Sequence, residues 1–137
     1  YNIARVDYEY ITGMDEKVTL SEFINNIDNE SSTLELYNAE STKITDLSEI
    51  VKTGQVIKLV INGKVYDELY IVLKGDLNGD GKINVSDKVI LQDHILLKNK
   101  ITDYRKYGME LIGDDKINVS DNVKLGEYIL KKIKTLN

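Results

Sequence analysis

The chain contains no cysteine, no proline and no tryptophan, and its only histidine is His94. The absence of cysteine excludes disulfide bonds, thiolate metal sites and cysteine nucleophiles. A single imidazole also excludes any site that needs two histidines. No apolar run approaches the roughly 20 residues that a transmembrane helix needs, and no segment has the pattern of a signal peptide. Because the sequence begins with Tyr1 rather than methionine, we expect it to be a piece of a longer protein.

Acidic residues outnumber basic ones, which gives the 137 residues a net charge of −5 and a pI of about 4.9. Nucleic acid and anionic membranes need a basic surface, so neither is expected as a partner. The charge is unevenly distributed: residues 1–74 hold 7 Lys and Arg against 13 Asp and Glu, whereas residues 75–137 hold 11 against 10. The acidity therefore belongs to the first part, and the second part becomes cationic if its acids bind metal.

Residues 1–74 have the pattern of a small α+β module. Alternating or β-rich segments predict four strands, at residues 8–11, 34–37, 56–61 and 64–73. Asn62-Gly63 lies between the last two strands and favours a type I′ hairpin turn. Thr19 and Glu22 form a capping box, which predicts a short helix. We therefore expect about four strands with one or two short helices.

The second part contains a duplication. Shifted by 34 residues, the segment 79–98 matches the segment 113–132 at thirteen of twenty positions, including the run KINVSD. A period of this length also occurs in helical solenoids, but those need about three copies to bury a core, so a two-fold paired unit is the better interpretation. No Pro-rich or Gly/Ser-rich linker separates the two parts, and we expect them to be rigidly coupled.

The first copy begins with a calcium-binding pattern, for which the alternative is an ordinary acidic surface turn. Oxygen-bearing side chains recur at loop positions 1, 3, 5, 9 and 12, the spacing by which a tightly wound loop surrounds a hard cation. Gly81 permits the sharp turn, and Ile83 is expected to pair with its counterpart in the second copy. Three acids would repel one another without an ion, so folding here should depend on metal. The candidate ligands are Asp76, Asn78, Asp80, Lys82 through its carbonyl, Asn84 and Asp87.

The second copy has lost part of this pattern. Ile112 replaces the ligand at position 3, Glu110 is one methylene longer than aspartate, and Asp115 replaces the glycine at position 6. Aspartate tolerates a left-handed backbone better than most residues, so the turn is expected to survive at a cost of about 1 kcal/mol. We expect one calcium ion in the first loop and a second loop that is weak, completed by water or empty. The candidate ligands here are Glu110, Asp114, Lys116, Asn118 and Asp121.

Two loops of this form, each followed by one helix, resemble a type I-like dockerin, a calcium-dependent module that anchors secreted proteins to a cellulosome-type scaffold. The resemblance covers residues 75–137, with loop–helix copies at 76–98 and 110–132. Residues 1–74 are similar to the small X-type modules that precede dockerins in proteins of polysaccharide degradation. The resemblance implies an all-α, EF-hand-like dockerin after the α+β module. It also implies a cohesin of a scaffoldin as partner, no enzymatic activity, and an extracellular, cell-surface complex of an anaerobic bacterium.

The resemblance further assigns a partner-binding face. Val85 with Ser86, and Val119 with Ser120, take the places of the cohesin-contacting loop exits, where the family often has Ser-Thr. Where the family commonly has a basic pair, this chain has Gln92-Asp93 and Gly126-Glu127, each with one acidic residue, so its cohesin should be apolar or basic there. The near identity of the two copies suggests binding in two orientations; the alternative is that both loops only need the same ligands. The assigned residues are Val85, Ser86, Gln92, Asp93, Leu97, Val119, Ser120, Gly126 and Glu127.

A second interpretation is a carbohydrate- or cell-wall-binding module in which calcium is only structural. The chain has nine tyrosines, and those on the strands of residues 1–74 would form a sugar-stacking strip, although these positions suit packing at least as well. Polysaccharide contact is expected only there or through the parent protein. A calcium sensor is disfavoured, because one loop is degenerate and no methionine-rich face is present. His94 aligns with Tyr128 in the repeat, which favours packing over catalysis.

Overall fold

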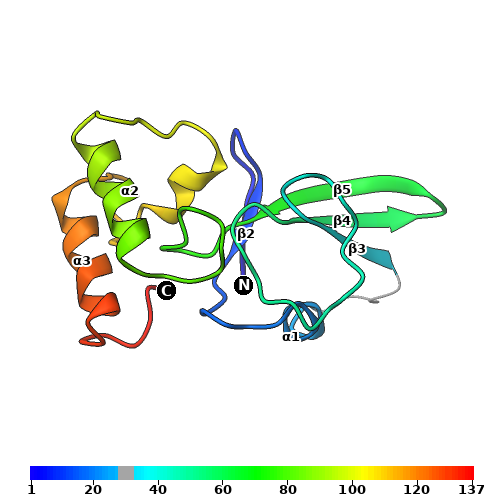
Figure 1. The fold of residues 1–137 in the computed structure, drawn as a ribbon. Helices are drawn as coiled ribbons and strands as arrows, with labels where there is room; N and C mark the ends of the chain where they lie inside the picture. The colour runs from blue at the N-terminus through cyan, green and yellow to red at the C-terminus, as the bar shows by residue number, and fades with distance from the viewer. Residues whose placement is uncertain (28–32) are drawn as a thin grey trace.

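The structure is a computed structural model that describes residues 1–27 and 33–137. Within these residues, a five-stranded sheet forms one side of the molecule and a pair of helices forms the other (Figure 1). The strand order is β1-β2-β5-β4-β3; β2 and β5 are parallel and the other neighbours are antiparallel. The strands are β1 Asn2–Ala4, β2 Tyr10–Thr12, β3 Leu34–Tyr37, β4 Val56–Ile61 and β5 Lys64–Ile71.

A hairpin of β4 and β5 lies at the centre of the first half. The turn residues Asn62 and Gly63 have φ angles of 51° and 76°, the left-handed conformations that a type I′ turn requires. All four predicted strands are present, the first shifted to Tyr10–Thr12 and the last ending at Ile71. The three-residue β1 was not predicted, because so short a strand has no readable alternation.

The short helix α1 (Leu20–Asn25) begins where the capping box predicts it. The Thr19 hydroxyl accepts the backbone N–H of Glu22 at 3.2 Å and so satisfies one of the free donors of the first turn. One face of the helix packs into the core, which stabilises a helix too short to form alone. Its buried residues are Leu20, Phe23 and Ile24.

The second half contains α2 (Val85–Ile95), the 3₁₀ helix η2 (Tyr104–Gly108) and α3 (Val119–Ile129). The helices α2 and α3 pack together and follow the repeat, since the corresponding Leu91 and Leu125 are both fully buried. Each of the two begins with an asparagine N-cap and an aspartate that together form a capping box. Every helix in the described residues is too short or too polar to cross a bilayer.

One hydrophobic core runs through both halves of the chain. It connects Ile71 at the end of the sheet to Leu73 and Leu77 in the connecting segment, and continues to Leu91 and Leu125 of the helices. These five side chains are at most 1% exposed. The sheet and the helices therefore form one packed body.

The fold-class prediction, an α+β module followed by an all-α EF-hand-like dockerin, is wrong. The described residues are organised around a five-stranded sheet with few helices, and the loops of the second half share the core of the sheet. Sequence patterns are local, whereas this organisation depends on contacts between distant segments. One such contact is the parallel pairing of Tyr10 with Tyr70 between β2 and β5.

Tyrosine rings fill the junction between the sheet and η2. The rings of Tyr70 and Tyr104 stack with centroids 4.3 Å apart, and those of Tyr10 and Tyr107 stack at 4.4 Å. Tyr8 adds edge contacts to Tyr70 and Tyr104. A sugar ring needs a free aromatic face, and these rings cover one another. The arrangement favours the packing interpretation of these tyrosines over a sugar-stacking strip.

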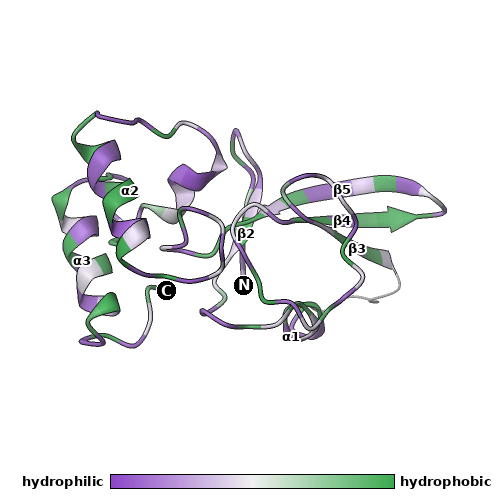
Figure 2. Cartoon of the chain, viewed as in Figure 1, coloured by the Kyte–Doolittle hydropathy of each residue, from purple (hydrophilic) through white to green (hydrophobic). Residues whose placement is uncertain are grey.

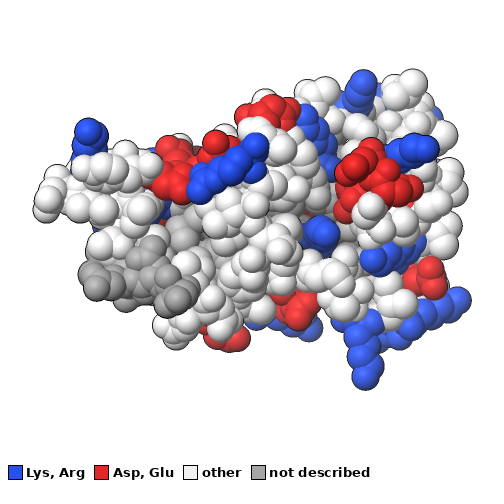
Figure 3. Space-filling model, turned by 180° about the vertical axis from the view of Figure 1, so that it is seen from behind, with Lys and Arg blue, Asp and Glu red and all other residues white. Residues whose placement is uncertain are grey.

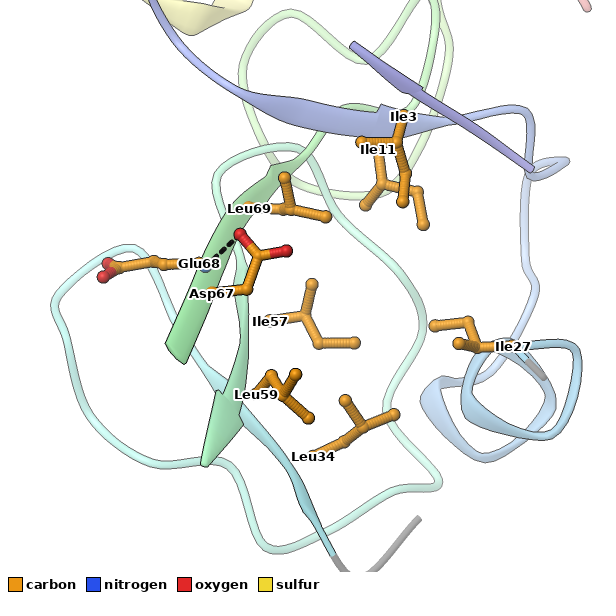
Figure 4. A pocket seen from close by; sticks show the side chains of 9 residues that line it. All are labelled: Ile3, Ile11, Ile27, Leu34, Ile57, Leu59, Asp67, Glu68 and Leu69. Carbon is orange, nitrogen blue, oxygen red and sulfur yellow. Dashed lines mark hydrogen bonds between the residues drawn. The ribbon is translucent and has the colours of Figure 1, made fainter. Parts of the chain in front are cut away.

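A small apolar hollow of about 110 Å³ lies between the sheet and the segment that follows α1 (Figure 4). Aliphatic side chains point into it, while Glu68 points away. The Asp67 carboxylate at its rim is already paired with the Arg5 guanidinium by two hydrogen bonds of 2.7 Å. Among the described residues that line the hollow, no polar side chain therefore both faces it and is left unpaired to orient a ligand. Its aliphatic lining is Ile3, Ile11, Ile27, Leu34, Ile57, Leu59 and Leu69.

Because Leu73 is buried between the two halves, its truncation should destabilise both together. We expect Leu73→Ala to lower the free energy of unfolding by about 2–5 kcal/mol, through lost burial and the cavity left behind. Denaturation followed by circular dichroism and by tyrosine fluorescence should give coincident curves. Leu47→Ala, at a leucine that is 37% exposed, is the control. Separate transitions for the two probes would contradict a single core.

Candidate metal centre and docking face

Three carboxylates converge at the start of the second half. One oxygen from each of Asp76, Asp80 and Asp87 lies within 4.8 Å of the others. They occupy positions 1, 5 and 12 of the first loop, so the structure brings together the acids selected by their spacing. Clustered carboxylate oxygens are the hard ligands that Ca²⁺ prefers.

Asp76 is completely buried and organises the first loop. Its Oδ1 accepts the N–H groups of Gly79 and Asp80 at 3.1 and 3.2 Å, and its Oδ2 accepts those of Gly81 and Thr53 at 3.1 and 2.9 Å. Burial raises the pKa of Asp76 to about 6, and neighbouring carboxylates add to the rise against the lowering effect of the hydrogen bonds. A cation at this site would stabilise the ionised carboxylate.

Asp87 closes the first loop and begins α2. Its Oδ1 accepts the N–H groups of Leu77 at 2.8 Å and Asn78 at 3.2 Å, while Oδ2 accepts that of Asn84 at 2.9 Å. Burial raises the pKa of this carboxyl as well. One carboxylate thus ties the loop to the helix N-terminus, so an ion held by Asp87 would also fix the first turn of α2.

The other candidate ligands lie at the rim of the loop. Asn78, Asp80 and Lys82 are exposed, and the N–H of Lys82 donates to Asp80 Oδ1 at 2.9 Å. The Asn84 side chain caps α2 by accepting the N–H of Ser86 at 3.1 Å. An amide oxygen has two lone pairs, so this one can also serve an ion or a bridging water. The donor set therefore fits calcium.

The backbone of Ile83 does not behave as expected. Its N–H donates to Glu16 Oε2 at 2.9 Å instead of pairing with its counterpart Ile117. Among the strand bridges of the described residues, none joins the two loops. The first loop is therefore tied to the first half of the chain.

The second loop keeps the same framework. One oxygen from each of Glu110, Asp114 and Asp121 again lies within 4.8 Å of the others. Asp121 accepts the N–H groups of Leu111 and Asn118 at 2.7 and 2.9 Å, the counterparts of the bonds made by the aspartate at position 12 of the first loop. In both loops the three acids therefore lie close together, but the residues around the two clusters differ.

The rest of the second loop faces solvent. Residues 112–116 are all exposed, and Asp115 has a φ angle of 60°, which confirms the expected left-handed aspartate. Ile112 is 46% exposed and places an apolar side chain where the first loop has the oxygen of a candidate ligand. The carbonyl of Lys116 belongs to this open turn. Fewer oxygens and fewer supporting contacts should both weaken ion binding.

A lysine of α3 is fastened to the second loop. The Lys124 ammonium donates to the carbonyl oxygen of Leu111 at 2.6 Å, whereas the corresponding residue of the first copy is Ile90. This positive charge holds the loop and lowers its attraction for a cation. The spacing of the candidate ligands could not reveal this contact, because Lys124 lies in α3, outside the loop.

Hydrophobic and hydrophilic residues alternate along the helices α2 and α3 (Figure 2). Some of the hydrophobic side chains are exposed, and they match between the two helices. Val85 and Val89 of α2 are 63% and 50% exposed, and Val119 and Val123 of α3 are 66% and 55% exposed. A spacing of four residues places each pair on one face of its helix. Val89 and Val123 were missed from the sequence, although their repetition in both copies was the available signal. The assigned Val85, Ser86, Val119 and Ser120 all lie exposed at the helix starts.

Leucines at the C-terminal ends of the helices are exposed as well. Leu96 and Leu130 are 53% and 69% exposed, and Leu97 is 74% exposed with a φ angle of 59°. A left-handed backbone costs a residue other than glycine about 1 kcal/mol. Burial of the Leu97 side chain does not offset this cost, because the side chain is exposed. We use the name docking face for two exposed sets taken together: Val85, Val89, Leu96 and Leu97 on α2 and directly after it, and Val119, Val123 and Leu130 on α3 and directly after it.

The remaining assigned contact residues have different surroundings. Gln92 is exposed, whereas Asp93 and Glu127 are half-buried. Gly126 lies in the contact between the helices, because a Cβ added there would come within 3.0 Å of Lys88 Cε. This glycine allows the close approach of the lysine stem.

Basic side chains gather over the end of the molecule formed by the second half, with an acidic patch among them (Figure 3). Both helices are followed by exposed lysines. Uptake of a divalent ion by the acidic loops would increase the positive charge of this half. The lysines in question are Lys98, Lys100, Lys131, Lys132 and Lys134.

No family model matches the chain, and no curated protein matches it. Among solved structures, the chain is similar to one from Acetivibrio cellulolyticus, in a complex of the third cohesin of ScaC with a ScaB dockerin mutated in its N-terminal helix, displaying a type I interaction. The match has 27% sequence identity, covers 47% of this chain and 90% of that chain, and has a TM-score of 0.44. At that TM-score the likeness assigns neither fold nor family.

Because the pKa of Asp76 is raised, we expect the free energy of unfolding of the calcium-free protein to depend on pH. Its pKa is about 6 in the folded state, above the usual value for aspartate, so the folded state binds this proton more tightly than the unfolded chain. In chelator, its contribution to the free energy of unfolding should therefore decrease as the pH rises through about 6. Denaturation of the native protein and of Asp76→Asn over this range isolates the contribution. If the native protein instead gained stability relative to Asp76→Asn as the pH rises through this range, the expected pH dependence would be contradicted.

The two loops should differ in calcium affinity. Calorimetry is expected to show one tighter event at the first loop and a weaker or absent event at the second. Lys124→Ile, which introduces the residue of the first copy, should strengthen binding at the second loop and lower calcium-free stability by about 1 kcal/mol. Lys132→Ile, at an exposed lysine, is the control. Two equally tight events in the native protein would contradict the asymmetry.

Proposed function

We propose that the chain is a calcium-dependent docking module that attaches its parent protein to a cohesin on a cellulosome-type scaffold. The observation that carries the proposal is the docking face, on which Val85 with Val89 and Val119 with Val123 form two matching ridges. Exposed apolar side chains grouped on a helix face are typical of protein-binding surfaces. Each ridge starts directly after a loop whose carboxylates converge.

Calcium would act through the helix starts. Asp87 and Asp121 each accept N–H groups from their loop and from the N-cap residue of the following helix. An ion bound beside them would order the loop and the first helical turn, which positions Val85 and Val119. Docking should therefore require calcium, although the ion itself need not touch the partner.

This module would be non-enzymatic and would act outside the cell, in a surface-associated complex. Residues 1–74 would support the docking half, and contact with polysaccharide would come through the parent protein. The mutual stacking of the tyrosines supports this assignment over a carbohydrate-binding module.

The two ridges correspond to each other in the repeat, which supports docking in two orientations. If each ridge can seat the same partner, loss of one ridge removes one of two equivalent modes. The affinity should then fall by only about two-fold, whereas loss of both ridges should abolish docking.

The test is calorimetric titration with a panel of cohesins, in calcium and in chelator. Val89→Asp and Val123→Asp should each reduce the affinity roughly two-fold, and the double variant should reduce it by more than about 100-fold. Val65→Asp, at a 45% exposed valine of β5, is the matched control. Complete loss with either single variant would contradict two orientations. Absence of binding to any cohesin in calcium, with retention on insoluble polysaccharide, would overturn the proposal in favour of a carbohydrate-binding module.

A further inference from the structure

The first loop rests against a segment of the first half, residues 50–53, which we call the wall. The N–H of Thr53 donates to Asp76 Oδ2 at 2.9 Å. A Cβ added at Gly79 would lie 2.9 Å from the Thr53 carbonyl oxygen, and one added at Gly81 would lie 2.6 Å from Ile50 Cδ1. The loop backbone therefore touches the wall so closely that no side chain fits between them.

The wall is braced by its own hydrogen bonds. The Thr53 hydroxyl donates to the carbonyl of Leu73 at 3.1 Å and accepts its N–H at 3.0 Å. The Gln55 side chain accepts the N–H of Lys52 at 2.8 Å and donates to the carbonyl of Ile50 at 3.3 Å. A braced neighbour restricts the conformations open to the loop before any ion arrives.

Glu16 of the first half holds the loop at another point. Its Oε2 accepts the N–H of Ile83 at loop position 8, and its Oε1 accepts the hydroxyl of Tyr128 on α3 at 2.8 Å. Burial and the Glu16 carboxylate raise the pKa of Tyr128, so its hydroxyl remains a donor at neutral pH. One carboxylate thus joins the first half, the first loop and the second repeated helix.

The second loop has no such support at the corresponding position. Gly113 corresponds to Gly79, and the two have similar φ angles of 88° and 77°. Apart from its chain neighbours, no described residue has an atom within 4 Å of a Cβ added at Gly113, whereas the wall is in contact at Gly79. The two loops therefore differ in their surroundings at a position where their backbones agree.

We propose that Glu16 and the wall position the first loop for calcium, so that the first half of the chain sets the affinity of this site. The inference rests on the proposed calcium-dependent function and names residues outside the ligand set that control it. An ion that binds a loose loop must order it, whereas a loop already held in place loses less conformational freedom. Groups that hold metal ligands in place are typically worth ten- to a hundred-fold in metal affinity.

The main experiment compares Glu16→Ala with the native protein by calorimetric calcium titration. The tighter event should weaken by about ten-fold, and any weaker event should not change. Glu49→Ala removes an exposed carboxylate from the same half and should leave both events unchanged. Hydrogen exchange in chelator gives a second measurement: the Ile83 amide should lose protection in Glu16→Ala, because its acceptor is gone.

Gly79→Ala and Gly113→Ala form a matched pair, because both place an alanine at the same loop position with a similar positive φ angle. Gly79→Ala should weaken the tighter calcium event more than Gly113→Ala weakens any event, since only the former displaces a loop from the wall. Native calcium affinity in Glu16→Ala and equal effects of the two glycine variants would overturn this inference alone. A native protein that takes up no calcium would overturn the proposed function together with it.

Discussion

The complete burial of the Asp76 carboxylate is the constraint on which the first loop and its surroundings depend. A buried carboxylate without compensation is costly, and its hydrogen bonds must be made by groups that the fold brings to it. Three of its four N–H donors belong to the loop itself, and the fourth is Thr53 of the first half. The sheet-bearing half therefore supplies one of the four hydrogen bonds that compensate this buried carboxylate. The burial that secures the loop also opposes the charged carboxylate, which leaves a role for a cation.

The same constraint explains why two copies of one motif differ in sequence where they do. In the first loop, Gly81 stands against the wall and any side chain there would collide with Ile50. In the second loop the corresponding position is open, and Asp115 occupies it with a left-handed backbone that aspartate tolerates. Lys124 supplies a fixed positive charge to that loop, where the first copy has an isoleucine. Packing thus distinguishes a first loop held against the wall from a second loop that is held by Lys124 and is otherwise open to solvent.

Features that depend on a few neighbouring residues were predictable from the sequence. The hairpin turn at residues 62–63 and the convergence of the loop acids follow from short spacings. The contacts of Thr53 with Asp76 and of Glu16 with Ile83 were not predictable, because nothing in a single threonine or glutamate identifies a distant partner. The fold class failed for the same reason, since the arrangement of the sheet and its shared core with the helices arise from long-range contacts.

The docking face is therefore nearly the same on the two helices, whereas the loops that precede the helices are supported differently. Val85 and Val119 are almost equally exposed, and each begins a helix that is capped by the last residues of its own loop. The start of α2 is held by a loop that the first half of the chain braces, whereas the start of α3 follows a loop that is largely open to solvent. If the chain docks in two orientations, as we propose, both use the same kind of contacts. In one orientation those contacts come from a helix that follows a braced loop, and in the other from a helix that follows an open loop. An ion bound in either loop would act on this difference, because it would have to order an open loop more than a loop already held by the wall.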